Sequence, residues 1–133
     1  MARLSSPKSK GDAYEREIAH RLNESVFDGR EQCYRAPLSG GGRSFAHAVD
    51  KAVVGGSADL MGTPGLWIEA KRTERFQPYE AMAQAERGRD SRQTGEVCVV
   101  VTRRNRMPTE KSLVVLRMDD FEKLYKSWLS QQA

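Results

Sequence analysis

Apolar side chains recur at intervals of three and four residues in two stretches of the chain, which is the spacing that places them on one face of a helix. The clearest example is the series Tyr14, Ile18 and Leu22. The two stretches predict helices over residues 11–25 and 118–129, and Pro78 fits the first turn of a third helix over residues 78–92. The first and last of these helices each have one apolar face, so we expect them to pack against another layer of structure.

Shorter apolar runs bounded by Gly or Pro predict strands between these helices. The strongest of them, residues 97–102, is almost entirely β-branched. The others cover residues 32–36, 57–61, 66–72 and 112–116, while residues 45–54 have only weakly helical spacing. The resulting order, α, β, β, β, α, β, β, α, predicts an α/β fold: a single domain with a mixed central β-sheet flanked by helices.

Length and charge fit one basic domain. A chain of 133 residues, 38% of them hydrophobic, can build a single core. Lys and Arg number 22 and Asp and Glu 18, so the net charge is +4, which suits a polyanionic partner. Residues 1–10 are polar and basic, and we expect them to form a flexible arm ahead of a folded domain over residues 11–133.

Several classes of site and location are disfavoured by the sequence. Cys33 and Cys98 lie far apart in apolar runs without a CxxC pair, so we expect reduced thiols and no zinc site. No GK[ST] follows the glycines at 40–42, which argues against a nucleotide cofactor. No apolar run is long enough to span a membrane, and the N-terminus lacks the apolar core of a secretory signal. We therefore expect a cytoplasmic protein with no membrane partner.

Charged residues interrupt the buried-strand pattern on either side of a turn at residues 62–65. If residues 63–65 close a hairpin, Asp59 lies directly opposite Glu69, where like charges destabilise a sheet. A cation between them would remove the repulsion, and carboxylate, carbonyl and water oxygens are the ligands that Mg²⁺ prefers. Lys71 lies on the same face as Glu69 because side chains alternate along a strand. The alternative is a solvated hairpin with unrelated charges.

The first predicted helix directs one acid toward the body of the protein. Glu15 falls within the apolar stripe, whereas Glu17 falls beside Arg21 on the side expected to face solvent. Glu15 could therefore complete the metal shell or bind a water molecule attached to the metal.

These residues carry a resemblance to a nuclease superfamily. Asp59 followed by Glu69-Ala70-Lys71 resembles the D…ExK signature of the PD-(D/E)XK nucleases, with Ala58 in place of the usual Pro. The restriction-endonuclease-like core of that superfamily is αβββαβ, which agrees with the predicted order of elements.

Two segments in the N-terminal half resemble one particular family of these nucleases. The segment KGDAYEREIAHRL, at 10–22, is similar to the KGxxxEREL helix that opens archaeal-type Holliday-junction resolvases. The segment YRAPLSGGG, at 34–42, is similar to the strand and Ser/Gly loop that follow it there. The resemblance covers most of residues 10–72, and residues 43–56 form a longer insertion than it leads us to expect. Residues 11–133 would then be the nuclease domain.

The resemblance implies roles for individual residues. It implies a metal site made by Glu15, Asp59, Glu69 and the carbonyl group of Ala70, holding Mg²⁺, for which Mn²⁺ can substitute. Lys71 would orient the attacking water or stabilise the charge that develops on the phosphate. Ser39 would lie in the loop that approaches the cleaved strand, as a further catalytic residue. On the helix after ExK, Gln84 is a weaker match to a Gln found in some related nucleases.

Basic residues near this site predict contacts with DNA phosphates. Arg16 and Arg35 match basic positions in the resemblance, and the cations around the predicted strands add further ones. The expected DNA-binding residues are Arg16, Arg35, Arg43, Arg72 and Arg75. The glycines at 40–42 fit either a flexible loop or a loop that faces the DNA.

The resemblance implies a Mg²⁺-dependent endonuclease that cuts branched DNA, with four-way junctions as the leading substrate. A four-way junction offers two symmetric strands, so we expect a twofold homodimer, with apolar surface near Trp128 and Leu129 as one possible contact. Two alternatives stay open: a nickase or a repair or restriction-type nuclease of the same fold, and a non-catalytic DNA-binding accessory protein of recombination.

Overall fold

A mixed β-sheet forms the centre of the structure, a computed structural model that describes residues 7–37 and 58–132. Its strands, in their order across the sheet, are β1 (Tyr34–Arg35), β2 (Leu60–Met61), β3 (Leu66–Arg72), β4 (Val97–Arg103) and β5 (Leu113–Val115). β3 and β4 are parallel, and the other neighbouring pairs are antiparallel. The α/β class predicted from the sequence is confirmed.

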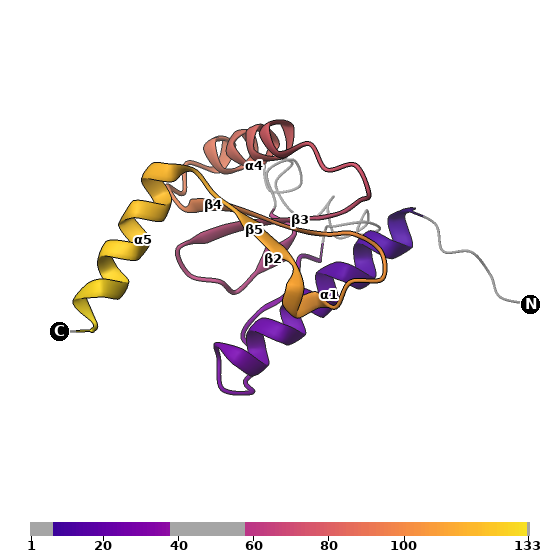
Figure 1. Cartoon of the computed structure of the whole chain (residues 1–133), viewed down its shortest axis with the longest axis horizontal. Coiled ribbons are helices and arrows are strands. Elements are labelled where there is room, and N and C mark those ends of the chain that lie inside the picture. The colour runs from indigo at the N-terminus through magenta and orange to yellow at the C-terminus, as the bar shows by residue number, and fades with distance from the viewer. Residues whose placement is uncertain (1–6, 38–57, 133) are drawn as a thin grey trace, which may run out of the picture.

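Helices cover both faces of this sheet. They are α1 (Pro7–Ser25), α4 (Pro78–Arg92) and α5 (Met118–Ser130), and a 3-10 helix, η1 (Thr109–Lys111), precedes β5. α1 and α4 lie on opposite sides of the sheet, whereas α5 leaves its edge and extends away (Figure 1). Within these two ranges, no helix combines the length and the apolar character that crossing a membrane requires.

Two apolar clusters fill the space on either side of the sheet. On the α1 side, Tyr14 and Ile18 pack with Ile68 of β3. On the α4 side, Trp67 of β3 packs with Met82. The alternation along β3 therefore sends its even-numbered residues toward α1 and its odd-numbered residues toward α4.

The cysteines are buried and free, one in each cluster, as expected. Burial raises the pKa of the Cys33 thiol and that of the Cys98 thiol to about 11. Both groups therefore stay protonated at neutral pH and act as small apolar core residues.

The predicted hairpin forms in the predicted register. Leu60 pairs with Ile68, so the next position of the ladder places Asp59 opposite Glu69. The Leu66 N–H donates to the Thr63 carbonyl at 3.0 Å, and Gly65 has φ +85°, which suits a type II turn with proline at its second position. The turn thus fixes which residues face each other across the two strands.

β1 is shorter than the expected strand at 32–36. The side chain of Asn23, instead of a neighbouring strand, bonds the backbone of the first two residues of that range. The Asn23 Oδ1 accepts the N–H groups of Gln32 (3.1 Å) and Cys33 (2.7 Å). The Asn23 amide also donates to the Cys33 carbonyl at 2.9 Å. These bonds take the polar groups of residues 32 and 33 out of the ladder, so regular pairing begins at Tyr34.

α1 begins four residues before the expected boundary between the arm and the folded domain. The helix starts at Pro7 rather than at residue 11. Proline fits the first turn because it needs no hydrogen-bond partner for its nitrogen and its φ is already helical. Gly11 weakens the helix by only about 1 kcal/mol relative to alanine, which does not end it. Residues 1–6 lie outside the described residues.

The expectation that Glu17 faces solvent holds only in part: its side chain is 40% exposed, and it also binds residues of other elements. Its carboxylate accepts from Arg103 at 2.7 Å and from Thr109 at 2.8 Å. The Arg103 guanidinium in turn lies over the Tyr14 ring, 5.0 Å from its centroid. The chain that follows β4 packs against this side of α1, so the buried face of the helix is wider than its apolar stripe.

A test of the hairpin compares two glycines with positive φ. A Cβ at Gly62 (φ +79°) would overlap the Gln32 carbonyl, whereas a Cβ at Gly65 (φ +85°) meets no atom within 4 Å. We expect Gly65→Ala to lower the free energy of unfolding by about 1–2 kcal/mol through backbone strain alone. Gly62→Ala should lower it by about 3 kcal/mol or more. Urea unfolding of both variants measures the difference, and equal losses would contradict the close approach at Gly62.

Candidate active site

The two strand acids meet where β1, β2 and β3 come together. The Asp59 N–H donates to the Ile68 carbonyl at 3.1 Å, and the Ala36 N–H donates to the Asp59 carbonyl at 2.9 Å. The Asp59 carboxylate accepts the Ala70 N–H at 2.8 Å, so this side chain is held by the strand beside it. Asp59 is therefore fixed through both its backbone and its side chain.

Glu69 lies in a buried position beside Asp59. Only 7% of Glu69 is exposed. Burial, and then the charge of Asp59, raises the pKa of Glu69 to about 8, while Lys71 acts in the opposite direction. A buried carboxylate this close to a second one does not carry a full charge without a partner. The site therefore favours a proton or a cation between them.

The indole of Trp67 positions Glu69, a role that the sequence analysis missed. The Trp67 Nε1–H donates to the Glu69 carboxylate at 3.1 Å. α4 approaches this ring at Gly88, where a Cβ would lie 2.8 Å from the Trp67 Cζ2. Residues two apart on a strand share a face, so the spacing of Trp67 and Glu69 was the available signal.

Lys71 of β3 lines a cavity that is also lined by the segment after β3 and by α4. Its ammonium group donates to the Gln84 side-chain carbonyl at 2.8 Å. The cavity has a volume of about 450 Å³, and Arg75, Arg87 and Glu80 are among its lining residues. Three cations against one acid make this cavity suitable for an anion such as a phosphate.

Glu15 lies on the other face of the sheet from Glu69. Its carboxylate binds the Arg35 guanidinium at 2.9 Å, and Arg35 also binds Asp12 at 2.7 Å. Arg35 pairs with Leu60, whose side chain belongs to the α1-side cluster, so this ion-pair group lies under α1.

Among the described residues, no three His, Cys, Asp or Glu side chains are close enough to hold a metal ion together. The structure thus brings Asp59, Glu69 and Lys71 together. It does not add Glu15 to them as a third acid.

The predicted DNA-binding residues lie in different surroundings. Arg75 lines the cavity beside Lys71, and Arg16 is exposed on α1. Arg35 is held between Asp12 and Glu15. The Nε of Arg72 is buried and has no hydrogen-bond partner in the described ranges. Ser39, Arg43 and the insertion at 43–56 lie outside the described residues.

Comparisons with models of protein families, with curated proteins and with solved structures gave no match.

The contact between Gly88 and Trp67 can be tested by whether one substitution raises or lowers the free energy of unfolding. On an open helix surface, Gly→Ala stabilises by about 1 kcal/mol. Here the new methyl group would press on a ring that is 4% exposed and cannot move aside, so we expect Gly88→Ala to destabilise by about 1–3 kcal/mol. Urea unfolding measures the change. A more stable variant would show that α4 does not lie against this ring.

Proposed function

We propose that the chain is a nuclease that depends on a divalent metal and hydrolyses phosphodiesters at Asp59, Glu69 and Lys71. One observation carries the proposal: the Asp59 and Glu69 carboxylates oppose each other, and Glu69 is buried, so repulsion and desolvation both act against its charge. A protein gains no stability from such a pair by itself. Binding a cation would offset both the repulsion and the desolvation.

The donor atoms fit Mg²⁺, for which Mn²⁺ can substitute. The Asp59 and Glu69 carboxylates would hold the ion, with the Ala70 carbonyl as a further donor, because hard divalent ions prefer oxygen ligands. When bound, the ion polarises a phosphate oxygen and lowers the pKa of water. The sequence resemblance assigns Glu15 to the metal site as well, but its ion pair with Arg35 on the other face of the sheet leaves it outside the site proposed here.

The surrounding side chains supply positioning and charge. Gln84 accepts from the Lys71 ammonium group and so holds it over the cavity. Lys71 can bind a phosphate oxygen or hold the attacking water, while Trp67 fixes the Glu69 carboxylate. Arg75 and Arg87, which line the same cavity, can bind a neighbouring phosphate without reading base sequence.

Branched DNA is the proposed substrate, and four-way junctions are its leading form. The support is the similarity of residues 10–72 to archaeal-type resolvases, together with the basic residues beside the acids. A nickase or a repair or restriction-type enzyme would use the same residues on linear DNA. A non-catalytic DNA-binding protein would keep the cationic cavity without needing the acid pair.

The first functional test is cleavage of a labelled four-way junction with and without Mg²⁺. We expect paired, symmetric cuts with Mg²⁺, and a loss of at least about 10³-fold in rate for Asp59→Asn and for Glu69→Gln, because each removes a metal ligand. Junction binding by gel shift should be retained in both variants.

The control is Glu24→Gln, which removes an exposed acid on α1 and should leave cleavage unchanged. A linear duplex of the same sequence separates the substrates, since equal cutting would favour a restriction-type enzyme. Full cleavage by both site variants would refute the assignment, and binding without any cut strand would support the non-catalytic alternative.

A second test follows the acid pair through thermal stability. In EDTA, Asp59→Asn should raise the melting temperature by roughly 3 °C, about what 1 kcal/mol produces in a domain of this size, because it removes the charge facing Glu69. Mn²⁺ should raise the melting temperature of the wild-type chain and leave that of Asp59→Asn unchanged. An equal Mn²⁺ effect on both chains would place metal binding elsewhere.

A further inference from the structure

The cavity beside Lys71 is lined by three chemically different kinds of side chain. They are cations, polar groups that accept hydrogen bonds, and an aromatic ring, represented by Lys71, Arg75 and Arg87, by Gln77 and Glu80, and by Phe76. Cations alone would be enough to bind an isolated phosphate. The other two kinds indicate a ligand that also has a flat, polar, uncharged part.

The size of the cavity fits a small molecule rather than a single ion. Its volume of about 450 Å³ falls within the range of about 300–1,000 Å³ that is usual for small-molecule sites. A DNA duplex cannot enter such a cavity, because its bases are stacked and paired inside the double helix. One nucleotide that leaves the stack can enter it.

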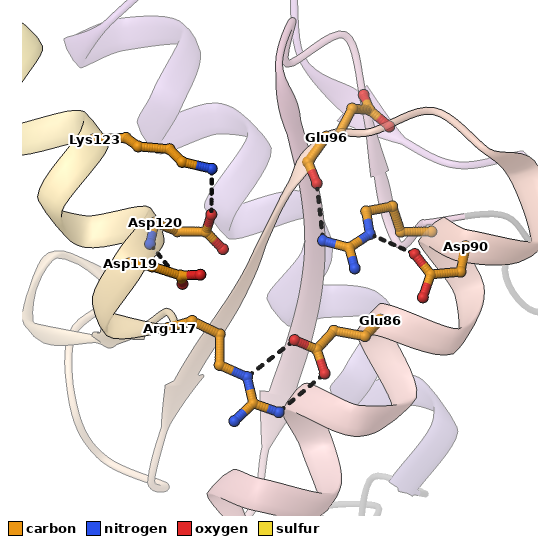
Figure 2. A network of polar contacts seen from close by, with 8 residues as sticks. Glu86, Asp90, Glu96, Arg117, Asp119, Asp120 and Lys123 are labelled. Carbon is orange, nitrogen blue, oxygen red and sulfur yellow. Dashed lines mark hydrogen bonds and ion pairs between the residues drawn. The ribbon is translucent and has the colours of Figure 1, made fainter.

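Two of the cations in this cavity are available to a ligand. Elsewhere on α4 the charge of Glu86 is already used, because its carboxylate accepts two hydrogen bonds of 2.9 Å from Arg117 (Figure 2). Arg75 and Arg87 are exposed, and neither forms an ion pair with any residue in the described ranges. Both can therefore bind a phosphate group without breaking an existing ion pair.

The aromatic ring and the acid suit the base of a nucleotide. Phe76 is half-buried and packs against the α4-side cluster, so its ring is held in place as a surface on which a base can stack. Glu80, in the first turn of α4, can accept the amino group of a base. An acid among the cations weakens a site for phosphate alone, so the combination fits a whole nucleotide better.

We infer that this cavity binds one nucleotide that is extruded from the DNA beside the bond that is cut. Lys71 lines the cavity and lies two residues after Glu69 on the same face of β3, so a strand that reaches the acids also passes the cavity. Extrusion costs least where pairing is already interrupted, as it is at a branch point. The inference deepens the proposed function, on which it rests for the choice of DNA as the ligand.

The test uses 2-aminopurine, an adenine analogue whose fluorescence rises when it leaves the base stack. The analogue is placed in turn at each nucleotide that flanks the branch point of a four-way junction. The protein carries Asp59→Asn, which should bind the junction without cutting it. We expect the fluorescence to rise by about fivefold or more on binding at one of these positions, because only one nucleotide enters the cavity.

A second substitution, added to Asp59→Asn, fills the cavity without changing its charge. Ala83 lines the cavity and is half-buried on α4, and leucine is a good helix former, so circular dichroism should show Ala83→Leu folded. We expect it to abolish the fluorescence rise and to weaken junction binding by about 10-fold, as loss of one stacked base does. The matched control is Ser91→Leu, which adds the same side chain at an exposed position of α4 outside the cavity and should keep the rise.

The outcomes separate this inference from the proposed function. A junction that binds with no rise at any position would overturn the inference, even if the wild-type chain cuts that junction. So would a rise that Ala83→Leu leaves intact, since the base would then leave the stack elsewhere. A rise with a chain that never cuts in Mg²⁺ would refute the nuclease proposal and leave the nucleotide site standing. Failure to bind the junction at all would overturn both.

Discussion

The opposition of Asp59 and Glu69 across β2 and β3 is the constraint on which the functional account depends. The turn at 62–65 sets the register, and the register puts two acids face to face where only 7% of Glu69 is exposed. Repulsion across this pair raises the pKa of Glu69 on top of the effect of burial. The fold is therefore strained electrostatically at one place, and a divalent cation is the simplest partner that would relieve it.

Neighbouring residues hold this strained pair in a fixed geometry. The indole of Trp67 donates to Glu69, and α4 can pack against that indole because Gly88 has no side chain. The same helix supplies Gln84, which holds Lys71 against the cationic cavity that both residues line. α4 thus orients Lys71 directly and Glu69 through the Trp67 ring, and fixed side chains of this kind are what a preorganised active site requires.

The sequence predicted those parts of the fold and site that follow from local rules. Strand alternation and turn chemistry were enough to place Asp59 opposite Glu69, as the structure confirms. Contacts between distant segments were beyond such rules: the pairing of Glu17 with Arg103 depends on where the chain after β4 returns. The orientation of the Glu15 carboxylate on α1 likewise depends on its ion pair with Arg35, twenty residues later in the chain.

The most direct measurement of the central claim is a crystal of the protein soaked in Mn²⁺ and examined at a wavelength where manganese scatters anomalously. The account predicts an anomalous peak bound by carboxylate oxygens of both Asp59 and Glu69, with Lys71 on the same side of the sheet. A crystal in which manganese binds elsewhere, while these two carboxylates share only a proton, would contradict it.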